Sequence, residues 1–233
     1  WYPRVTKIVE IKAKPALYKF YAEVGFDEGE KIKAASASEG TLIHEAFEAI
    51  LMGQNPTVDP SIAPAIAAAV KFIKTNKIHV DPAFVERRVV NYEHRYAGTI
   101  DTLALIGGKF GILDIKTSLS IYRDYNLQTA AYMDTLRAQN LQTRWIIRID
   151  QHALCAKCSA TLRGKGGRDK ILDPYPRLYV WKRCADNEHS FGPVMGHVEL
   201  KEFPYWHDDF AAFLGAKKLW EWENDYWLKK FYK

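Results

Sequence analysis

The sequence predicts a fold of the α/β class. Its sheet is expected to be mixed, as in α+β proteins, with helices packed on it. Hydrophobic residues make up 48% of the 233 residues, enough for one large core. The expected elements run in the order helices, strands, long helix, strand, strand, helix, which is typical of this class. A Gly107-Gly108 pair between two apolar runs predicts a β-hairpin within the sheet.

Each expected element rests on a local pattern. Residues 4–9 are expected to form a short strand or extended entry, and residues 53–60 a loop. Apolar residues at helical spacing, with Gly25 and Gly40 as boundaries, predict the helices. The helices are expected at residues 15–23, 28–38, 40–51, 63–75, 121–138 and 210–232. Strands are expected at residues 80–90, 96–104, 110–116, 143–149, 178–181 and 197–203.

The Gly107-Gly108 hairpin carries the clearest chemical signal. If the two glycines are the turn residues, Asp101 lies directly opposite Asp114. Opposed side chains in a hairpin lie about 5 Å apart at Cβ, so two bare carboxylates would repel each other. A divalent cation relieves that repulsion, because carboxylate oxygens are the ligands that Mg²⁺ prefers. Lys116 points to the same face as Asp114, and the three side chains suit metal-dependent hydrolysis of a phosphodiester.

Five residues elsewhere become candidates for the same site once Asp101 and Asp114 are taken as metal ligands. His44 and Glu48 are spaced to share one helix face, and Gln128 and Tyr132 have the same spacing on a later helix. Glu86 is expected on the strand before the hairpin. Taken alone, each has a structural explanation as a core histidine, a surface acid, a polar edge or a buried aromatic.

The order of these motifs resembles the PD-(D/E)xK nuclease superfamily. Gly40 to His44, Glu86, Gly98 to Asp101, Asp114-Ile115-Lys116 and Gln128 to Tyr132 follow one another as in its RecB-like exonuclease branch. More narrowly, residues 4–6, 17–21 and 40–44 are similar to phage exonucleases and to the mitochondrial genome maintenance exonuclease group. The resemblance covers residues 4 to about 150 and implies a restriction-endonuclease-like core. Ile100 stands where the motif's proline would be, a common substitution in the superfamily.

The resemblance also implies a set of metal ligands. Asp101, Asp114 and the backbone carbonyl of Ile115 would bind Mg²⁺ or Mn²⁺, and His44 would be a ligand from the helical side. An imidazole ligand suits Mn²⁺. Glu86 would support these ligands or bind a second metal ion.

Three other residues complete the catalytic set that the resemblance implies. Lys116 would hold or polarise the attacking water, and Gln128 and Tyr132 would support the site and contact the substrate backbone. The expected function is a DNA exonuclease on single strands or strand ends, in replication, recombination or repair. The alternatives are a structure-specific or restriction-type endonuclease, a nuclease of CRISPR adaptation, and a non-catalytic DNA-binding module. Intact Asp101, Asp114 and Lys116 argue against the module.

The three cysteines lie together in the later part of the chain. Cys155-x2-Cys158 has the spacing of a zinc knuckle, and Cys184 and His189 would complete four ligands, with His152 as the alternative fourth. A redox CxxC and three unrelated buried cysteines are the competing interpretations. We therefore expect a nuclease core at residues 1–150, a zinc-ribbon-like insert at 151–192 and a completing strand and helix at 193–233.

Basic residues are concentrated in the expected insert. Residues 151–192 contain eight Lys and Arg against four Asp and Glu, within a total net charge of +5. This favours a polyanionic partner, although a solvated loop would look the same. The expected DNA-binding residues are Arg163, Lys165, Arg168 and Lys170. The sequence has no apolar run long enough to span a membrane, and its cysteine usage favours an intracellular protein, in a bacterial cytoplasm or a phage-infected cell.

The C-terminal segment combines tryptophans with lysines. Trp220 and Trp227 are seven residues apart, so we expect them on one helix face that packs on the core. Base stacking by such residues is the alternative.

Overall fold

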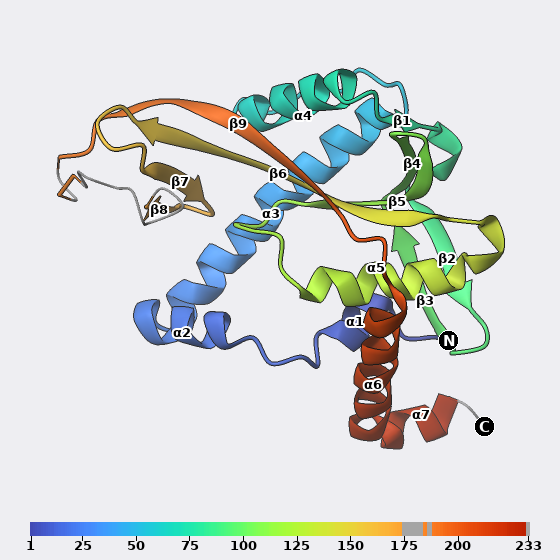
Figure 1. The fold of residues 1–233 in the computed structure, drawn as a ribbon. Coiled ribbons are helices and arrows are strands. Elements are labelled where there is room, and N and C mark those ends of the chain that lie inside the picture. Colours follow the sequence, from blue (N-terminus) through green and yellow to red (C-terminus); the bar gives the residue numbers. More distant parts are fainter. Residues whose placement is uncertain (174–183, 186–187, 232–233) are drawn as a thin grey trace.

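The computed structural model describes residues 1–173, 184–185 and 188–231 (Figure 1). Its centre is a mixed sheet in the order β1-β4-β5-β6-β7-β8, with β9 also paired to β6. The strands are β1 (His79–Val80), β4 (Thr102–Ile106), β5 (Lys109–Lys116), β6 (Thr143–Cys155), β7 (Thr161–Lys165), β8 (Arg168–Leu172) and β9 (Phe191–Glu202). A separate antiparallel pair is made by β2 (Arg87–Asn91) and β3 (Tyr96–Ile100).

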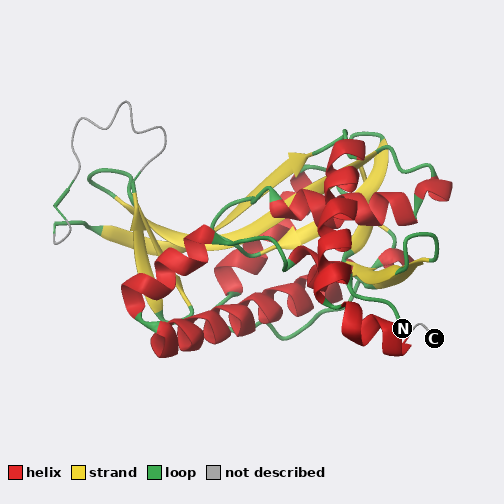
Figure 2. Cartoon of the chain, turned by 90° about the horizontal axis from the view of Figure 1, so that it is seen from below, coloured by secondary structure: helices red, strands yellow, loops and turns green. Residues whose placement is uncertain are grey.

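Helices cover both faces of the sheet (Figures 1 and 2). They are α1 (Val5–Val9), α2 (Pro15–Val24), α3 (Phe26–Leu51), α4 (Ala63–Thr75), α5 (Asp124–Thr135), α6 (His207–Glu223) and α7 (Asp225–Phe231). One apolar cluster joins α3 and α4 to the sheet, and a second joins α1, α5 and α6 to β3 and the opposite face. The predicted fold class, a mixed sheet with helices packed on it, is confirmed.

Two predictions for the N-terminal part are wrong. Residues 5–9 form the short helix α1 rather than a strand, and it buries Val5 and Ile8. Residues 26–51 form one continuous helix rather than two. Gly40 does not break α3, because it marks a close approach: a Cβ there would lie 2.8 Å from the Thr117 hydroxyl oxygen.

The expected strands around the hairpin are divided differently. Residues 80–90 are split by a short 3₁₀ helix at Pro82–Phe84, and residues 96–104 bend at Asp101. The predicted register holds from Thr102 opposite Leu113 to Ile106 opposite Lys109. Asp101 therefore lies at the corner where the chain passes from the small sheet to the large one. The predicted pairing of Asp101 directly opposite Asp114 is therefore not made: the β4–β5 ladder stops one residue short of it, and the Asp101 side chain accepts from the Ile115 N–H instead.

Strand β6 is the longest strand that the structure describes, and it organises the sheet. On one edge it pairs in parallel with β5 through Arg148 and then antiparallel with β7 at Ala153 and Leu154. The opposite edge pairs with β9, which starts earlier than the predicted residues 197–203. Because β6 continues past residue 150, the expected insert grows directly from a core strand. The predicted strand at 178–181 lies outside the described residues.

The buried Arg144 of β6 ties the C-terminal segment to the core. Its guanidinium donates to the carbonyl oxygens of Asn126 (2.7 Å), Phe203 (3.1 Å) and Tyr205 (3.1 Å) and forms an ion pair with Asp209 of α6. Only 1% of Arg144 is exposed. These bonds hold the chain where it leaves the sheet and enters α6.

The predicted C-terminal helix is broken at Asn224, between α6 and α7. Trp220 packs against the second apolar cluster, as expected. Trp227 is 58% exposed, so the expected shared core face does not extend across the break. The expected helix 121–138 is shorter as well, because α5 ends at Thr135 and a 3₁₀ turn follows at Arg137–Gln139. Among the described residues, none of the helices has the length and apolarity to cross a membrane.

Candidate functional site

An acidic cluster lies where α3 passes the bend between β3 and β4. His44 and Glu48 of α3 and Asp101 of the bend offer ligand atoms that all lie within 4.8 Å of one another. His44 Nδ1 is 3.5 Å from Glu48 Oε1. One imidazole nitrogen and two carboxylates at these separations could hold a divalent metal ion.

Asp101 is held in place by β5, the second strand of the hairpin. The Ile115 N–H of β5 donates to Asp101 Oδ2 at 2.6 Å. Strand β4 begins only at Thr102, opposite Leu113, so it supplies no ladder partner at Ile115. The Asp101 carboxylate takes that place and is fixed beside the next two residues of interest, Asp114 and Lys116.

Asp114 and Lys116 form a buried ion pair on β5. Lys116 Nζ is 2.6 Å from Asp114 Oδ2, and the two side chains are 16% and 1% exposed. Apart from this ion pair, neither Asp114 oxygen has a hydrogen-bond partner among the described residues. The ammonium of Lys116 also lies 5.1 Å from the centre of the Tyr125 ring. Asp114 is thus a buried carboxylate with unused acceptor capacity.

The electrostatics of the site favour a cation. Burial raises the pKa of Asp114 to about 6, with Lys116 opposing the rise and Asp101 adding to it. Burial and the neighbouring Glu48 raise the pKa of Glu86 to about 7. Burial lowers the pKa of His44, but its contacts with Glu48 and Asp101 outweigh this and leave the pKa above its usual value. Several carboxylates close together in a partly dry site are relieved by a divalent ion.

Glu86 reaches the site from a turn, not from the strand that was predicted for it. Its N–H donates to the Asp101 carbonyl oxygen at 2.9 Å, and its φ is +53°. A non-glycine residue in the left-handed region is strained, and such strain clusters at functional sites. The turn places Glu86 beside Glu48 and Asp101, as the causes of its raised pKa indicate.

Gln128 and Tyr132 lie together on α5. Gln128 Nε2 donates to the Tyr132 hydroxyl at 3.4 Å, and Tyr132 is 2% exposed. Tyr132 packs tightly on Gly98 of β3, where a Cβ would lie 2.6 Å from the ring. The two motif glycines that the sequence analysis quoted, Gly40 and Gly98, therefore both mark places where a helix meets the chain next to the acidic cluster.

The structure thus brings most of the predicted site together. His44 and Asp101 share one cluster with Glu48, Glu86 lies beside that cluster, and Asp114 and Lys116 both interact electrostatically with His44. The structure assigns the Ile115 N–H to Asp101. Glu48 was not predicted as a ligand, although its position four residues after His44 was the available signal.

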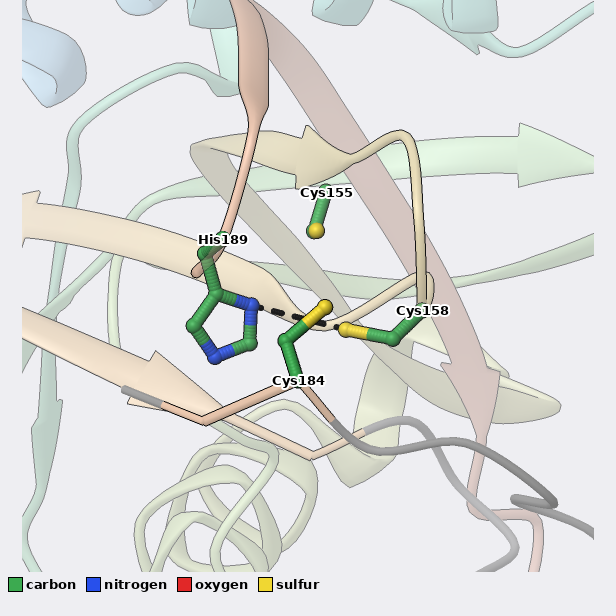
Figure 3. A group of neighbouring side chains, drawn as sticks. All are labelled: Cys155, Cys158, Cys184 and His189. Atoms are coloured by element: carbon green, nitrogen blue, oxygen red, sulfur yellow. Dashed lines mark hydrogen bonds between the residues drawn. The ribbon is translucent and has the colours of Figure 1, made fainter. Parts of the chain in front are cut away.

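A second cluster contains the three cysteines (Figure 3). Cys155, Cys158, Cys184 and His189 place their ligand atoms within 4.8 Å of one another, with Cys158 Sγ 3.4 Å from His189 Nδ1. The set could hold a metal such as zinc, which four thiolate and imidazole ligands bind tetrahedrally. His152, the alternative fourth ligand, instead packs its ring 5.3 Å from that of His197.

The thiols of Cys155 and Cys184 in this cluster have pKa values shifted in opposite directions. Burial opposes ionisation of Cys155, but hydrogen bonds from His189 and the Ser190 backbone outweigh it and lower the pKa to about 5. Burial and the neighbouring cysteines raise the pKa of Cys184 to about 11. Crowded sulfur atoms of this kind ionise together only when a metal offsets their charge.

The four expected DNA-binding residues differ in their surroundings. Arg163 and Lys165 of β7 point inward and bond to the carbonyl oxygen of Thr117. Arg168 lies over the Phe20 ring, 5.1 Å from its centre, while Lys170 is exposed. Only part of the predicted basic surface therefore faces solvent.

No protein-family model matches the chain, and no curated protein matches it either.

Proposed function

We propose that the chain is a metal-dependent deoxyribonuclease that hydrolyses phosphodiester bonds, built on a PD-(D/E)xK core of the RecB-like type. The observation that carries the proposal is the Asp101–Asp114–Lys116 arrangement beside His44 and Glu48. The sequence resemblance supplies the expected substrate, which is single-stranded DNA or DNA ends.

The residues of the site fit a divalent cation. Asp114 is buried with no hydrogen-bond partner among the described residues apart from its ion pair with Lys116, and the pKa values of Asp114 and Glu86 lie well above the usual range for carboxyl groups. His44, Glu48 and Asp101 supply one nitrogen and carboxylate oxygens, a donor set that suits Mn²⁺ as well as Mg²⁺. Such an ion, when bound, makes water more acidic and neutralises charge on phosphate.

The chain's own groups would do the remaining work. Lys116 carries a positive charge next to the carboxylates, because the pull of Asp114 and Asp101 on its ammonium outweighs the effect of burial on its pKa. An ammonium there can orient an attacking water and offset negative charge that develops on phosphorus. The Ile115 N–H fixes the orientation of Asp101. Tyr132 is too buried to contact a substrate as expected, but its hydroxyl accepts from Gln128 and so positions the Gln128 side chain, which would hold a nucleotide backbone.

We further propose that the Cys155–Cys158–Cys184–His189 cluster binds a structural Zn²⁺. Its four ligand atoms are already close together, and Cys155 favours the thiolate form. Zinc would then stabilise the strands and turns that follow residue 155, which carry few buried side chains of their own.

The test is cleavage of end-labelled linear and circular single-stranded DNA in Mg²⁺ and in Mn²⁺. We expect wild type to degrade linear DNA, and Lys116→Met to lose cleavage while still binding Mn²⁺. The exposed Lys71→Met variant on α4 is the matched control and should cleave as wild type does. Cutting of circles would instead indicate an endonuclease. DNA binding without cleavage in either metal, equal in wild type and Lys116→Met, would indicate the non-catalytic module and contradict the proposal.

A further inference from the structure

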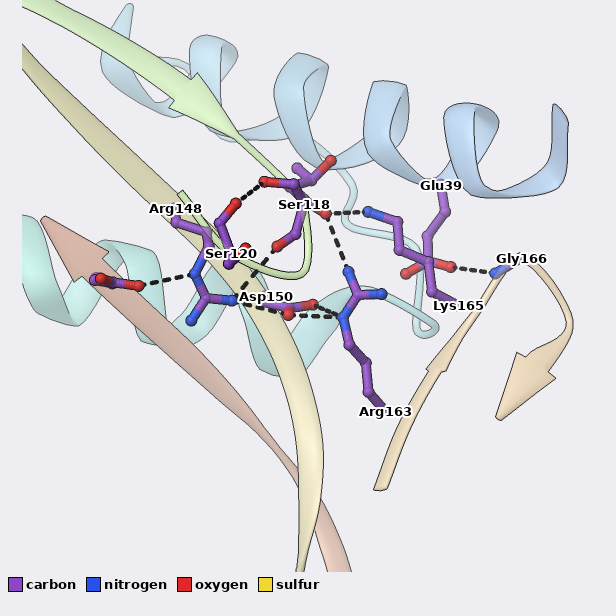
Figure 4. Close-up of polar contacts among 10 residues, drawn as sticks. Glu39, Ser118, Ser120, Arg148, Asp150, Arg163, Lys165 and Gly166 are labelled. Atoms are coloured by element: carbon purple, nitrogen blue, oxygen red, sulfur yellow. Dashed lines mark hydrogen bonds and ion pairs between the residues drawn. The ribbon is translucent and has the colours of Figure 1, made fainter. Parts of the chain in front are cut away.

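Three cationic side chains hold the backbone directly after the catalytic lysine (Figure 4). Arg163 Nη2 donates to the Thr117 carbonyl oxygen at 3.2 Å, and Lys165 Nζ donates to the same oxygen. Arg148 Nη1 donates to the Ser118 carbonyl oxygen at 3.4 Å. These two carbonyl groups lie one and two residues after Lys116, where β5 has ended.

The topology explains why these groups meet. β9 occupies one edge of β6, so β5 and β7 both pair with the other edge, one beyond the other. β5 runs parallel to β6 and ends opposite Arg148, whereas β7 runs antiparallel and returns from Leu154 toward that end. The two strand ends therefore face each other along one edge of β6, and the side chains of β7 bridge the gap.

A buried carboxylate organises the bridge. Arg163 Nε lies 2.7 Å from Asp150 Oδ2, and Arg148 Nη1 lies 3.0 Å from the same oxygen. Asp150 is 6% exposed and the Arg163 side chain 12% exposed. A cation paired this way inside the protein is costly to release, so Arg163 is poorly placed to leave Asp150 for a DNA phosphate.

The hairpin of β7 and β8 is anchored at both of its ends. Its tip rests on α3, where the Gly166 N–H donates to Glu39 at 3.3 Å. Gly166 has a φ of +61°, and a side chain there would collide with Ser36. Its base adjoins the Cys₃His cluster, because the Cys155 N–H donates to the Ala160 carbonyl oxygen at 2.8 Å, one residue before β7 begins.

We propose that Arg163 and Lys165 are positioning residues for Lys116, and that metal in the Cys₃His cluster holds the hairpin that carries them. The proposal rests on the proposed nuclease function. It replaces DNA binding by these two cations with an internal role: they fix the end of β5 and, through it, the ammonium that faces the acidic cluster. A shift of about 1 Å at a reacting group costs on the order of 100-fold in rate.

The first experiment separates positioning from DNA binding. Arg163→Gln and Lys165→Met should each lower the cleavage rate at saturating DNA by about 100-fold. KM and the slope of DNA affinity against salt should stay as in wild type. Arg163→Lys should recover part of the rate, because it keeps a donor near Thr117. Lys165→Met keeps the Asp150 ion pairs and remains informative if Arg163→Gln does not fold; Lys71→Met is the matched control.

The second measurement does not depend on activity. Backbone amide hydrogen exchange at Ile115, whose N–H donates to Asp101 near the end of β5, should speed up in Arg163→Gln, in Lys165→Met and in the zinc-deficient Cys184→Ser variant. Unchanged exchange in all three would overturn the proposal, as would a raised KM and a shallower salt slope at an unchanged saturated rate. If wild type cleaves no DNA at all, the proposed function fails, and the exchange measurement still decides whether the hairpin holds this segment.

Discussion

Replacing Gly98 with alanine tests the contact between α5 and β3 that supports the candidate site. The added Cβ would lie 2.6 Å from Tyr132 Cε1 and 2.9 Å from its hydroxyl, whereas ordinary contact begins at 3.4 Å. The ring would have to retreat by about 0.8 Å, the difference between 3.4 and 2.6 Å. Tyr132 is 2% exposed, so neighbouring side chains oppose that movement. Overpacking of this kind costs about 1–3 kcal/mol of unfolding free energy.

Urea unfolding and the DNA cleavage rate are the two assays. Gly98→Ala should be less stable by that amount, and cleavage should slow because Tyr132 moves away from the position where it bonds Gln128. In a Tyr132→Leu background the same substitution should cost much less, because the ring is gone. Gly215→Ala is the matched control: nothing lies within 4 Å of its added Cβ on α6, so it should stabilise by about 0.5–1 kcal/mol. Equal costs of Gly98→Ala in both backgrounds would refute the packing argument.

Three other predictions follow from the buried charges and the cysteine cluster. Arg144→Met should destabilise the protein by about 3–5 kcal/mol in urea unfolding, because it leaves Asp209 and three carbonyl groups without their donor, and a loss below about 1 kcal/mol would contradict this. Mn²⁺ affinity measured by calorimetry should rise from pH 5 to 8, because protons must leave Asp114 (pKa about 6) and Glu86 (pKa about 7), and a flat profile would count against both groups. Cys184→Ser should lower bound zinc from one ion per chain to nearly none in metal analysis and lower Tm, while zinc retained at wild-type level would exclude Cys184 as a ligand.

The sequence alone predicted the hairpin register, the paired residues on each helix face and the cysteine cluster. The Gly107-Gly108 turn fixed the register of β4 and β5, and helical spacing placed His44 beside Glu48 and Gln128 beside Tyr132. Cysteine spacing anticipated the Cys₃His cluster. These features depend on turn geometry and side-chain periodicity, which a single sequence carries.

The remaining features depend on contacts between distant segments. Gly40 was interpreted as a helix boundary, whereas the structure requires a small residue there because Thr117 passes so closely. The bend at Asp101 arises from the change of sheet between β3 and β4, which no local pattern marks. The inward direction of Arg163 depends on β7 pairing to the same edge of β6 as β5, so composition alone suggested a basic surface instead.

Helix α3 has a mechanical consequence because it is uninterrupted from Phe26 to Leu51. At 1.5 Å per residue it is a rod about 39 Å long. Glu39, near its middle, receives the tip of the β7–β8 hairpin, and His44 and Glu48, about one and a half and two and a half turns further on, belong to the acidic cluster. A rod without a hinge transmits displacement along its length. Any displacement of the hairpin tip would therefore reach His44 and Glu48 as a rigid-body movement of α3.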